Sequence, residues 1–302
     1  MALSVYIIKK YLKILAGKND MTVNQVEGQC YSKNEVEGYY NDLTEKITKF
    51  GFPDNQVPIT EPAPGIKMEF SIAIFQYGLA AYDLYLLTKD DSYLGKLKAC
   101  AEWAVKNQEE NGAWPTFTYK RPDQLYSAMA QGEALSLLVR AHKVFGDDRY
   151  LISAKKAKEF MMLPIEQGGT TIYKNGHIYL YEYVNAPQVL NGWIFSAWGL
   201  FDYGKYLNDS ETLDQWKNTI MAMSKNLPRF DNGFWSMYSD GGGIANPFYH
   251  KLHIALLNTM YDLTGISVFK EYRDKFARYQ NTKWNCIKAF VIKIWQKSIS
   301  KD

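Results

Sequence analysis

Apolar residues recur every three to four positions through most of the chain, which is the spacing of amphipathic helices. Between these stretches the pattern breaks at short runs rich in Gly, Asn, Asp and Pro, which are typical of turns. The pattern predicts helices at about 36–50, 69–88, 92–108, 127–145, 148–162, 191–207, 210–226, 250–264 and 267–280.

The turns between paired helices resemble one another: "LTKDDSYLGKL", "VFGDDRYLISA", "YLNDSETLDQW" and "LTGISVFKEYR". Aligning Leu94, Leu151, Leu213 and Phe269 on them gives spacings of 57, 62 and 56 residues. A helical hairpin that recurs four times buries its apolar face only by stacking on its neighbours. We therefore expect an all-α fold. The long repeat favours an α/α toroid, an incomplete barrel of helical hairpins, over an open solenoid.

Three turn-rich segments interrupt the helices, at 111–120, 168–183 and 231–247. Their Gly, Asn and Pro content predicts tight turns and short β-hairpins, inserted at one rim of the toroid, where we expect the functional site. The predicted organisation is an N-terminal helical segment (1–68) packed on the toroid, the toroid itself as catalytic domain (69–282), and a basic amphipathic helix (283–302).

Aromatic residues make up 15% of the chain, with 23 Tyr and 8 Trp. Such side chains suit carbohydrates, because sugar faces stack on rings while phenols bond hydroxyls, although large helical cores also use many aromatics. A net charge of +3 without a basic run argues against nucleic acid as a partner. Three scattered cysteines without a CxxC pair argue against a disulfide framework or a zinc site, and favour a reducing compartment.

Both ends of the chain pattern as basic amphipathic helices. Residues 1–17, "MALSVYIIKKYLKILAG", lack the features of a secretory signal, and their lysines prevent them from spanning a bilayer. The end "KWNCIKAFVIKIWQKSISK" alternates large apolar residues with lysines. Such helices either lie on an anionic membrane surface or pack on their own protein. We expect a cytoplasmic, bacterial protein, with contact to a membrane or a polysaccharide synthase and homodimerisation left open.

Four segments, in order, resemble the C-terminal domain of D-glucuronyl C5-epimerases: "IAIFQYGLAAYDLYLLTKD", "SAMAQGEALSLLVRAH", "EYVNAPQVLNGWIFSAWGLFDY" and "NPFYHKLHIALL", which span residues 72 to 257. The resemblance implies an α/α toroid that converts D-glucuronate to L-iduronate within heparosan-type polysaccharides, with no cofactor and no metal. It implies removal of the sugar C5 proton and return of a proton to the opposite face.

The chemistry of that reaction explains why Tyr and Glu would surround the site. Inversion requires two proton-transfer groups, one on each face of the ring, and donors that stabilise charge on the substrate carboxylate. By the resemblance, Glu182 and Tyr249 are the opposed base and acid, and Tyr183 and Tyr238 orient or stabilise. A tyrosine of ordinary pKa, about 10, is protonated at pH 7 and can donate.

Eight further residues are candidates for contacting substrate: Tyr126, Gln131, Arg140, Asn191, Trp114, His250, His253 and Arg121. Several of them also have a structural interpretation. Arg140 could satisfy buried carbonyls, Asn191 could cap a helix, and Trp114 could be a hydrophobic staple. The two histidines have the i, i+3 spacing of metal ligands but lack a third ligand, so a structural or positioning role is favoured.

The sequence departs from the family pattern at two informative places. The run "VNAPQV" after the Glu-Tyr pair is short, and "YSDGGG" lacks the arginine that follows the third tyrosine and suits the substrate carboxylate. Lys120, Arg121 and Arg140 are the candidate replacements. Two other functions therefore stay open: a uronate lyase of the same fold, which expels the 4-linked sugar, and a glycan-binding protein without catalysis.

Overall fold

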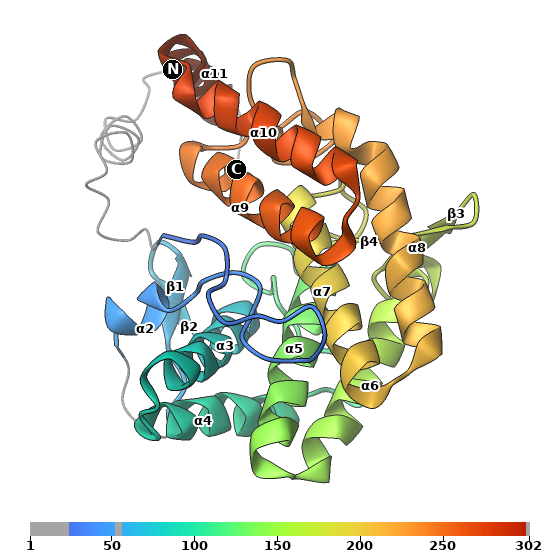
Figure 1. Cartoon of the computed structure of the whole chain (residues 1–302). Coiled ribbons are helices and arrows are strands. Elements are labelled where there is room, and N and C mark those ends of the chain that lie inside the picture. The colour runs from blue at the N-terminus through green and yellow to red at the C-terminus, as the bar shows by residue number, and fades with distance from the viewer. Residues whose placement is uncertain (1–23, 52–55, 300–302) are drawn as a thin grey trace.

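Four helical hairpins follow one another in the computed structural model, which describes residues 24–51 and 56–299 (Figure 1). In each hairpin the first helix packs on the second. The pairs are α3 (Ser71–Thr88) with α4 (Ser92–Asn107), α5 (Ala128–Phe145) with α6 (Asp148–Met162), α7 (Leu190–Leu207) with α8 (Ser210–Asn226), and α9 (Pro247–Thr264) with α10 (Ser267–Asn281). These bounds confirm eight of the nine predicted helices.

The first helices of the hairpins form an inner row. α3 packs against α5, α5 against α7 and α7 against α9, while α4, α6, α8 and α10 lie on the outside of their partners (Figure 1). The inner helix α7 carries apolar residues nearly all round, and its run Leu190–Gly204 is buried throughout. A helix that is apolar on every face has to be covered on every face. The predicted incomplete barrel of helical hairpins is confirmed.

The central helices α5 and α7 touch through their backbones. A Cβ added to Gly132 of α5 would lie 2.6 Å from the Cα of Ser196 on α7, and a Cβ on Gly199 would lie 2.6 Å from the carbonyl carbon of Gly132. Only glycine allows such an approach. The small residues that the sequence places in α5 thus bring two inner helices together.

The N-terminal part differs from the prediction. The helix expected at 36–50 is wrong except for one turn, α2 (Glu45–Thr48), and the rest of 24–51 is irregular with a bridge between Glu27 and Asn41. A hairpin of β1 (Thr60–Ala63) and β2 (Ile66–Met68) follows. The periodic pattern misled because Tyr39, Tyr40 and Leu43 are buried against the toroid by tertiary packing. The amphipathic stretch 1–17 lies outside the described residues.

The other insertions and the C-terminal helix follow the prediction more closely. Segment 168–183 contains the antiparallel hairpin β3 (Thr171–Lys174) and β4 (His177–Leu180), whereas 111–120 and 231–247 are turns and isolated bridges. Helix α11 (Lys283–Ile299) has an exposed apolar stripe that includes Trp284, 78% exposed. In the described part of the chain, no helix has the length and apolar character needed to cross a membrane. Attachment to a membrane surface stays a prediction.

Candidate active site

A cavity of about 430 Å³ opens where the four inner helices begin. Its wall includes Gln76 from the first turns of α3, Met129 from α5, Asn191 from α7 and Tyr249 from α9. The beginning of a helix carries unpaired N–H groups and the positive end of the helix dipole. Four such ends around one cavity favour an anionic occupant.

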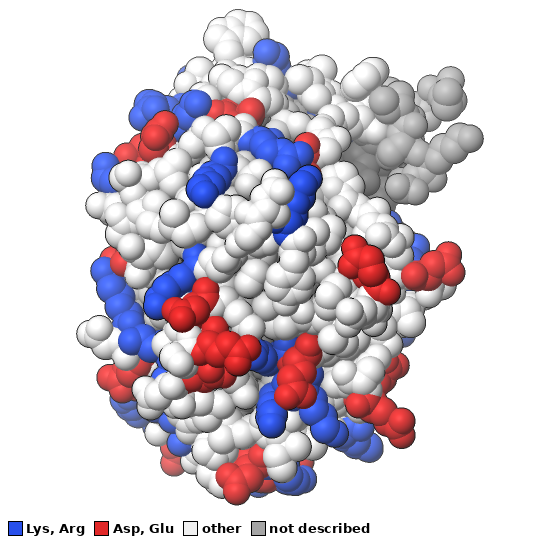
Figure 2. Space-filling model, turned by 90° about the vertical axis from the view of Figure 1, so that its right-hand side faces the viewer, with Lys and Arg blue, Asp and Glu red and all other residues white. Residues whose placement is uncertain are grey.

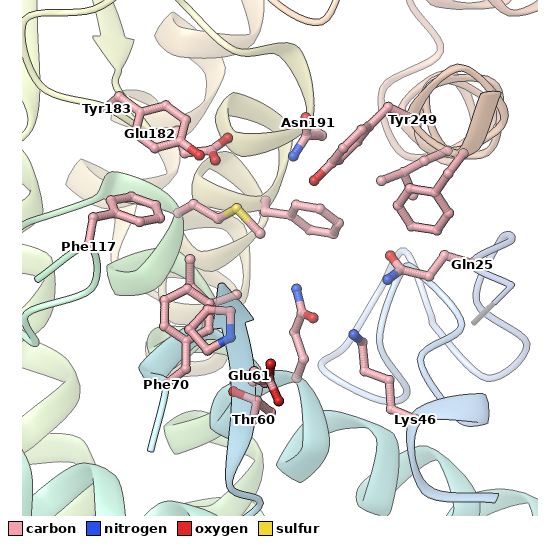
Figure 3. A pocket seen from close by; sticks show the side chains of 18 of the residues that line it. Gln25, Lys46, Thr60, Glu61, Phe70, Phe117, Glu182, Tyr183, Asn191 and Tyr249 are labelled. Carbon is pink, nitrogen blue, oxygen red and sulfur yellow. The ribbon is translucent and has the colours of Figure 1, made fainter. Parts of the chain in front are cut away.

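Loops and the N-terminal segment complete the wall. The aromatic lining consists of Phe70, Phe117, Tyr119, Tyr183, Phe195, Phe248 and Tyr249, and the hairpin residues Thr60, Glu61 and Pro62 close another side (Figure 3). Two of the three predicted rim segments, 111–120 and 168–183, contribute to the lining, and Tyr238 of the third contacts Glu182. The prediction that these segments meet at one rim is therefore confirmed.

Glu182 is held at the cavity by the end of β4 and the start of α7. The N–H of Ala128 donates to the carbonyl of Tyr181 (2.9 Å), which fixes the chain on α5 just before the glutamate. Gly192 allows α7 to pass against the side chain, because a Cβ there would lie 2.6 Å from the Cβ of Glu182. The carboxylate is thereby wedged between a strand end and a helix beginning.

The environment of Glu182 suits a proton acceptor. The residue is 4% exposed, and its Oε2 has no hydrogen-bond partner among the described residues. Burial raises the pKa of this carboxyl to about 7, although hydrogen bonds from Tyr183 and Tyr238 and the charge of Arg121 oppose the rise. A base works best when its pKa lies near the working pH. One oxygen is thus free to take a proton at neutral pH.

Two tyrosines face this carboxylate from the α9 side. Asn246 caps α9 by accepting from the N–H of Tyr249 (2.8 Å), which places the phenol at the cavity. The rings of Tyr238 and Tyr249 meet edge to face at 4.8 Å, and the Tyr238 hydroxyl lies 3.5 Å from Oε1 of Glu182. Figure 3 shows Glu182 and Tyr249 reaching into the same opening from opposite sides.

The phenols are proton donors rather than bases. Burial, reinforced by the negative charge of Glu182, raises the pKa of Tyr249 to about 12. The same causes raise the pKa of Tyr183 and of Tyr238 above the ordinary value. All three hydroxyls are therefore protonated when Glu182 is ionised. One carboxylate surrounded by three donors can accept one proton and return another.

The ring of Tyr183 is held in place by Phe117 and Arg121. Its ring lies against Phe117, with centroids 4.6 Å apart, and the Arg121 guanidinium lies 4.7 Å from the ring centroid on a cation–π contact. Arg121 also donates to Gln124 (3.1 Å) and does not line the cavity. Its observed contacts support Tyr183 and lower the pKa of Glu182.

Asn191 lines the cavity, as expected of a substrate-contacting residue. The alternative that it caps the helix is wrong, since α7 begins at Leu190 after Val189, and Asn191 is the second helical residue. Its Oδ1 is buried and has no partner among the described residues. An unsatisfied buried acceptor at a cavity is available for a ligand hydroxyl.

Arg140 is not positioned to contact substrate. Its side chain is fully buried, pairs with Asp202 (2.6 Å), and donates to the carbonyls of Glu37 (2.7 Å) and Gly38 (3.1 Å). The prediction of a substrate-binding role is corrected. Arg140 satisfies buried carbonyls of the irregular N-terminal segment.

Three other candidates also lie away from the cavity lining. Trp114 is fully buried and its indole donates to the carbonyl of Ala104 (2.9 Å), so it is a core residue rather than a stacking platform. Tyr126 donates to Glu109 (2.6 Å) outside the cavity. Gln131 is fully buried in α5. These substrate-binding predictions are corrected, because packing and hydrogen bonding direct each side chain elsewhere.

His250 and His253 form a buried structural cluster with Ser236. Nε2 of His250 donates to the carbonyl of Phe276 (3.0 Å), so its Nδ1 accepts from the Ser236 hydroxyl (2.8 Å). Nδ1 of His253 lies 2.9 Å from the same hydroxyl and donates to it. Burial lowers the pKa of the two rings to about 4 and about 3. The histidines do not line the cavity but fix the loop that carries Tyr238, so their role is positioning.

Several residues of the cavity lining were not predicted from the sequence. Lys46, Gln25 and the β1–β2 hairpin come from the N-terminal part, where the expected helix did not form. Gln76 lies in a correctly predicted helix, and a polar residue within an apolar inner helix was a signal that could have found it. Over the part of the chain that the structure describes, no group of three or more His, Cys, Asp or Glu side chains could hold a metal ion.

The amino-acid sequence is similar to those of two curated proteins. It is 29% identical over 210 residues to the D-glucuronyl C5-epimerase of Caenorhabditis elegans, covering 60% of this chain and 34% of that protein. It is 33% identical over 155 residues to an uncharacterized protein of Methanocaldococcus jannaschii, covering 49% of this chain and 50% of that one. The chain therefore spans a third to a half of the length of these relatives.

Structure and family comparisons agree with the fold. A GH76 alpha-mannanase of Bacteroides thetaiotaomicron shares 17% identity with a TM-score of 0.51, covering 72% of this chain and 58% of the mannanase, which shows a common fold. Residues 108–278 match the family described as D-glucuronyl C5-epimerase C-terminus. This match covers more than half of the sequence and includes Glu182, Tyr183, Tyr238 and Tyr249. The chain belongs to the D-glucuronyl C5-epimerase C-terminal family.

Proposed function

We propose that the protein inverts C5 of D-glucuronate residues within a polysaccharide such as heparosan, giving L-iduronate during capsule or exopolysaccharide assembly. The observation that carries the proposal is Glu182, a buried carboxylate with a pKa of about 7 that lines the cavity together with Tyr183 and Tyr249 and is contacted by Tyr238. Membership of the epimerase family and the resemblance of the Glu-Tyr and Tyr-His segments support it.

In this mechanism Oε2 of Glu182 removes the C5 proton, and the electron pair moves into the adjacent carboxylate. Tyr249 donates a proton to C5 from the other side of the sugar, leaving a phenolate. Glu182 is then protonated and Tyr249 deprotonated, so one proton has to pass between them before the next turnover. Tyr238 contacts both residues and provides that path. Hydroxyl donors around the opening stabilise the intermediate charge.

The test is incubation of the protein with heparosan in deuterated water, with the uronate C5 position followed by NMR. Deuterium at C5 together with iduronate signals is the expected result, and Glu182→Gln and Tyr249→Phe should each abolish it. An unsaturated product absorbing in the near ultraviolet would replace the proposal by a lyase. Binding without exchange on heparosan and on other glucuronate polymers would replace it by a glycan-binding function.

A further inference from the structure

The reaction proposed above develops negative charge at the substrate carboxylate, where a cation is stabilising, and the sequence lacks the arginine that the family pattern would supply. The candidate replacements do not line the cavity. Arg140 forms a fully buried ion pair with Asp202, and neither Arg121 nor Lys120 is among the residues that line the cavity. Arg229, which lies near Tyr238 in the sequence, forms an ion pair with Asp240 (2.9 Å). A positive charge at the substrate carboxylate therefore has to come from another residue.

Lys46 of α2 lies on the cavity wall together with Glu182 and Tyr249. In Figure 3 its amine end points into the opening that the labelled side chains surround, next to Gln25. Of the residues that the structure describes, Lys46 is the only Lys or Arg in the lining. Its ammonium makes no hydrogen bond or ion pair with any of them. A half-buried ammonium without such a partner is available to a ligand.

The neighbours of Lys46 hold it in place without using its charge. Glu45 accepts two hydrogen bonds from Asn24 (2.6 and 3.0 Å), and Ile47 is buried in the core. The residues on both sides are thus fixed, which directs Lys46 toward the cavity. Its position depends on the irregular segment that Arg140 ties to the toroid.

The acidic side chains in the cavity lining also favour a cation beside a bound uronate. Among the described lining residues, the acidic and basic side chains other than Lys46 are Glu61 and Glu182. Without Lys46, the charged groups that a uronate meets there are therefore negative. Glu133, behind Gln76, does not neutralise the lysine, because burial raises the pKa of Glu133 to about 8 and keeps it protonated near neutral pH. Burial lowers the pKa of Lys46. An incoming carboxylate opposes that shift by favouring the charged form.

We propose that Lys46 binds the carboxylate of the uronate whose C5 is deprotonated, and so selects uronate over neutral sugars in this cavity. Because the carboxylate is attached to C5, a cation there also stabilises the negative charge that develops when Glu182 removes the proton. The assignment rests on the proposed function for the identity of the reacting atom, but carboxylate recognition can be measured separately.

The experiment compares heparosan oligosaccharides with the same oligosaccharides after reduction of their carboxylates to primary alcohols. Binding is measured by calorimetry on full-length Glu182→Gln protein, in which turnover is blocked. The native ligand should bind at least about 10-fold more tightly, in line with the loss expected when a charged hydrogen bond is removed. Lys46→Met should erase this preference, and Lys46→Arg should retain most of it.

Lys49→Met is the matched control, because it removes the same charge from the neighbouring exposed surface. It should keep the preference. Thermal unfolding of Lys46→Met should match that of the unsubstituted protein, since the ammonium makes no hydrogen bond within the described part of the chain. With Glu182 restored, Lys46→Met should lower kcat/KM for C5 exchange about 10- to 100-fold.

The two proposals fail in different ways. A carboxylate preference that depends on Lys46, without any C5 exchange, would support the lysine assignment and remove the epimerase function. C5 exchange with a preference that survives in Lys46→Met would do the reverse. Equal binding of native and reduced oligosaccharides by the Glu182→Gln protein would also overturn the assignment.

Discussion

Nη1 of Arg140 lies 2.6 Å from Oδ2 of Asp202, and both side chains are fully buried. Tyr40 donates to the other carboxylate oxygen (2.6 Å), and the guanidinium donates to the carbonyls of Glu37 and Gly38. The pair therefore joins inner helices α5 and α7 to the irregular N-terminal segment. That segment carries Lys46 to the cavity wall, so a structural ion pair determines the composition of the site.

Arg140→Met should destabilise the protein by about 3–5 kcal/mol, because it leaves Asp202 buried without its counter-charge. Urea unfolding at pH 7 measures the change. Arg149→Met is the control: Arg149 is exposed and its ion pairs with Asp147 and Glu102 lie on the surface, so little change is expected. Equal effects of the two substitutions would show that the buried pair is not the anchor described here.

The inner helices were predictable to within two or three residues, since α5 was expected at 127–145 and begins at Ala128. Glu182 and Tyr249 were identifiable from their motifs, and they do meet at one cavity. The direction of a polar side chain on a buried helix was not predictable. Arg140 and Gln131 lie on the same helix as Met129, yet only Met129 lines the cavity.

Lys46 could not have been found in the same way. Its segment forms only a single turn of helix, and its position is set by contacts with residues far along the chain. Local periodicity carries no information about such contacts. Periodicity therefore predicts a helix in the N-terminal part that does not form. For the same reason it does not predict that Lys46 lines the cavity.

The rate of C5 exchange should depend on the ionisation of Glu182. Since burial raises the pKa of this base to about 7, kcat/KM should fall about tenfold per pH unit as the pH drops below 7. Tyr249, with a pKa of about 12, stays protonated through pH 9 and adds no falling limb there. A profile measured from pH 5 to 9 by NMR tests this.

Glu61→Gln is the control for that profile, because Glu61 is the other glutamate in the cavity lining. The limb near pH 7 should persist in this variant. If the fall in kcat/KM below pH 7 disappears in Glu61→Gln, or if the profile of the unsubstituted protein is flat between pH 5 and 8, Glu182 is not the base.

Tyr238→Phe should slow sustained turnover about 10- to 100-fold while sparing the first turnover, because Tyr238 is the proposed path that returns the proton from Glu182 to Tyr249. Rapid-quench measurement of deuterium at C5 should then show a burst. Tyr181→Phe, which alters a residue lining a different cavity beside Trp193, should show none. Equal slowing of the first and later turnovers would leave Tyr238 with an orienting role only.

Gly192→Ala should reduce activity at least tenfold with a modest loss of stability. The new Cβ would lie 2.6 Å from the Cβ of Glu182, so the glutamate has to move away from its position beside α7. Displacement of a catalytic group by about 1 Å can cost about 100-fold in rate. Gly146→Ala, at the exposed end of α5, is a control for loss of a glycine and should keep full activity. Unchanged exchange kinetics in Gly192→Ala would contradict the wedged position of the base.

Stability should fall between pH 7 and 8, and Glu133 should account for much of the fall. Burial raises the pKa of Glu133 in the folded protein to about 8, against about 4.3 in an unfolded chain. In this range the folded state holds a proton that the unfolded state has released, so each pH unit costs about 1 kcal/mol of unfolding free energy. His250 and His253 are neutral in the folded state and contribute little above pH 7.

Glu133→Gln keeps an acceptor for Gln76 but cannot ionise, so its urea unfolding curves at pH 7 and 8 should lie closer together. Glu166→Gln, at an exposed position, should keep the original difference. The same difference in Glu133→Gln would mean that Glu133 is ionised in the folded protein, and Lys46 would then have a negative partner rather than a free charge for the uronate.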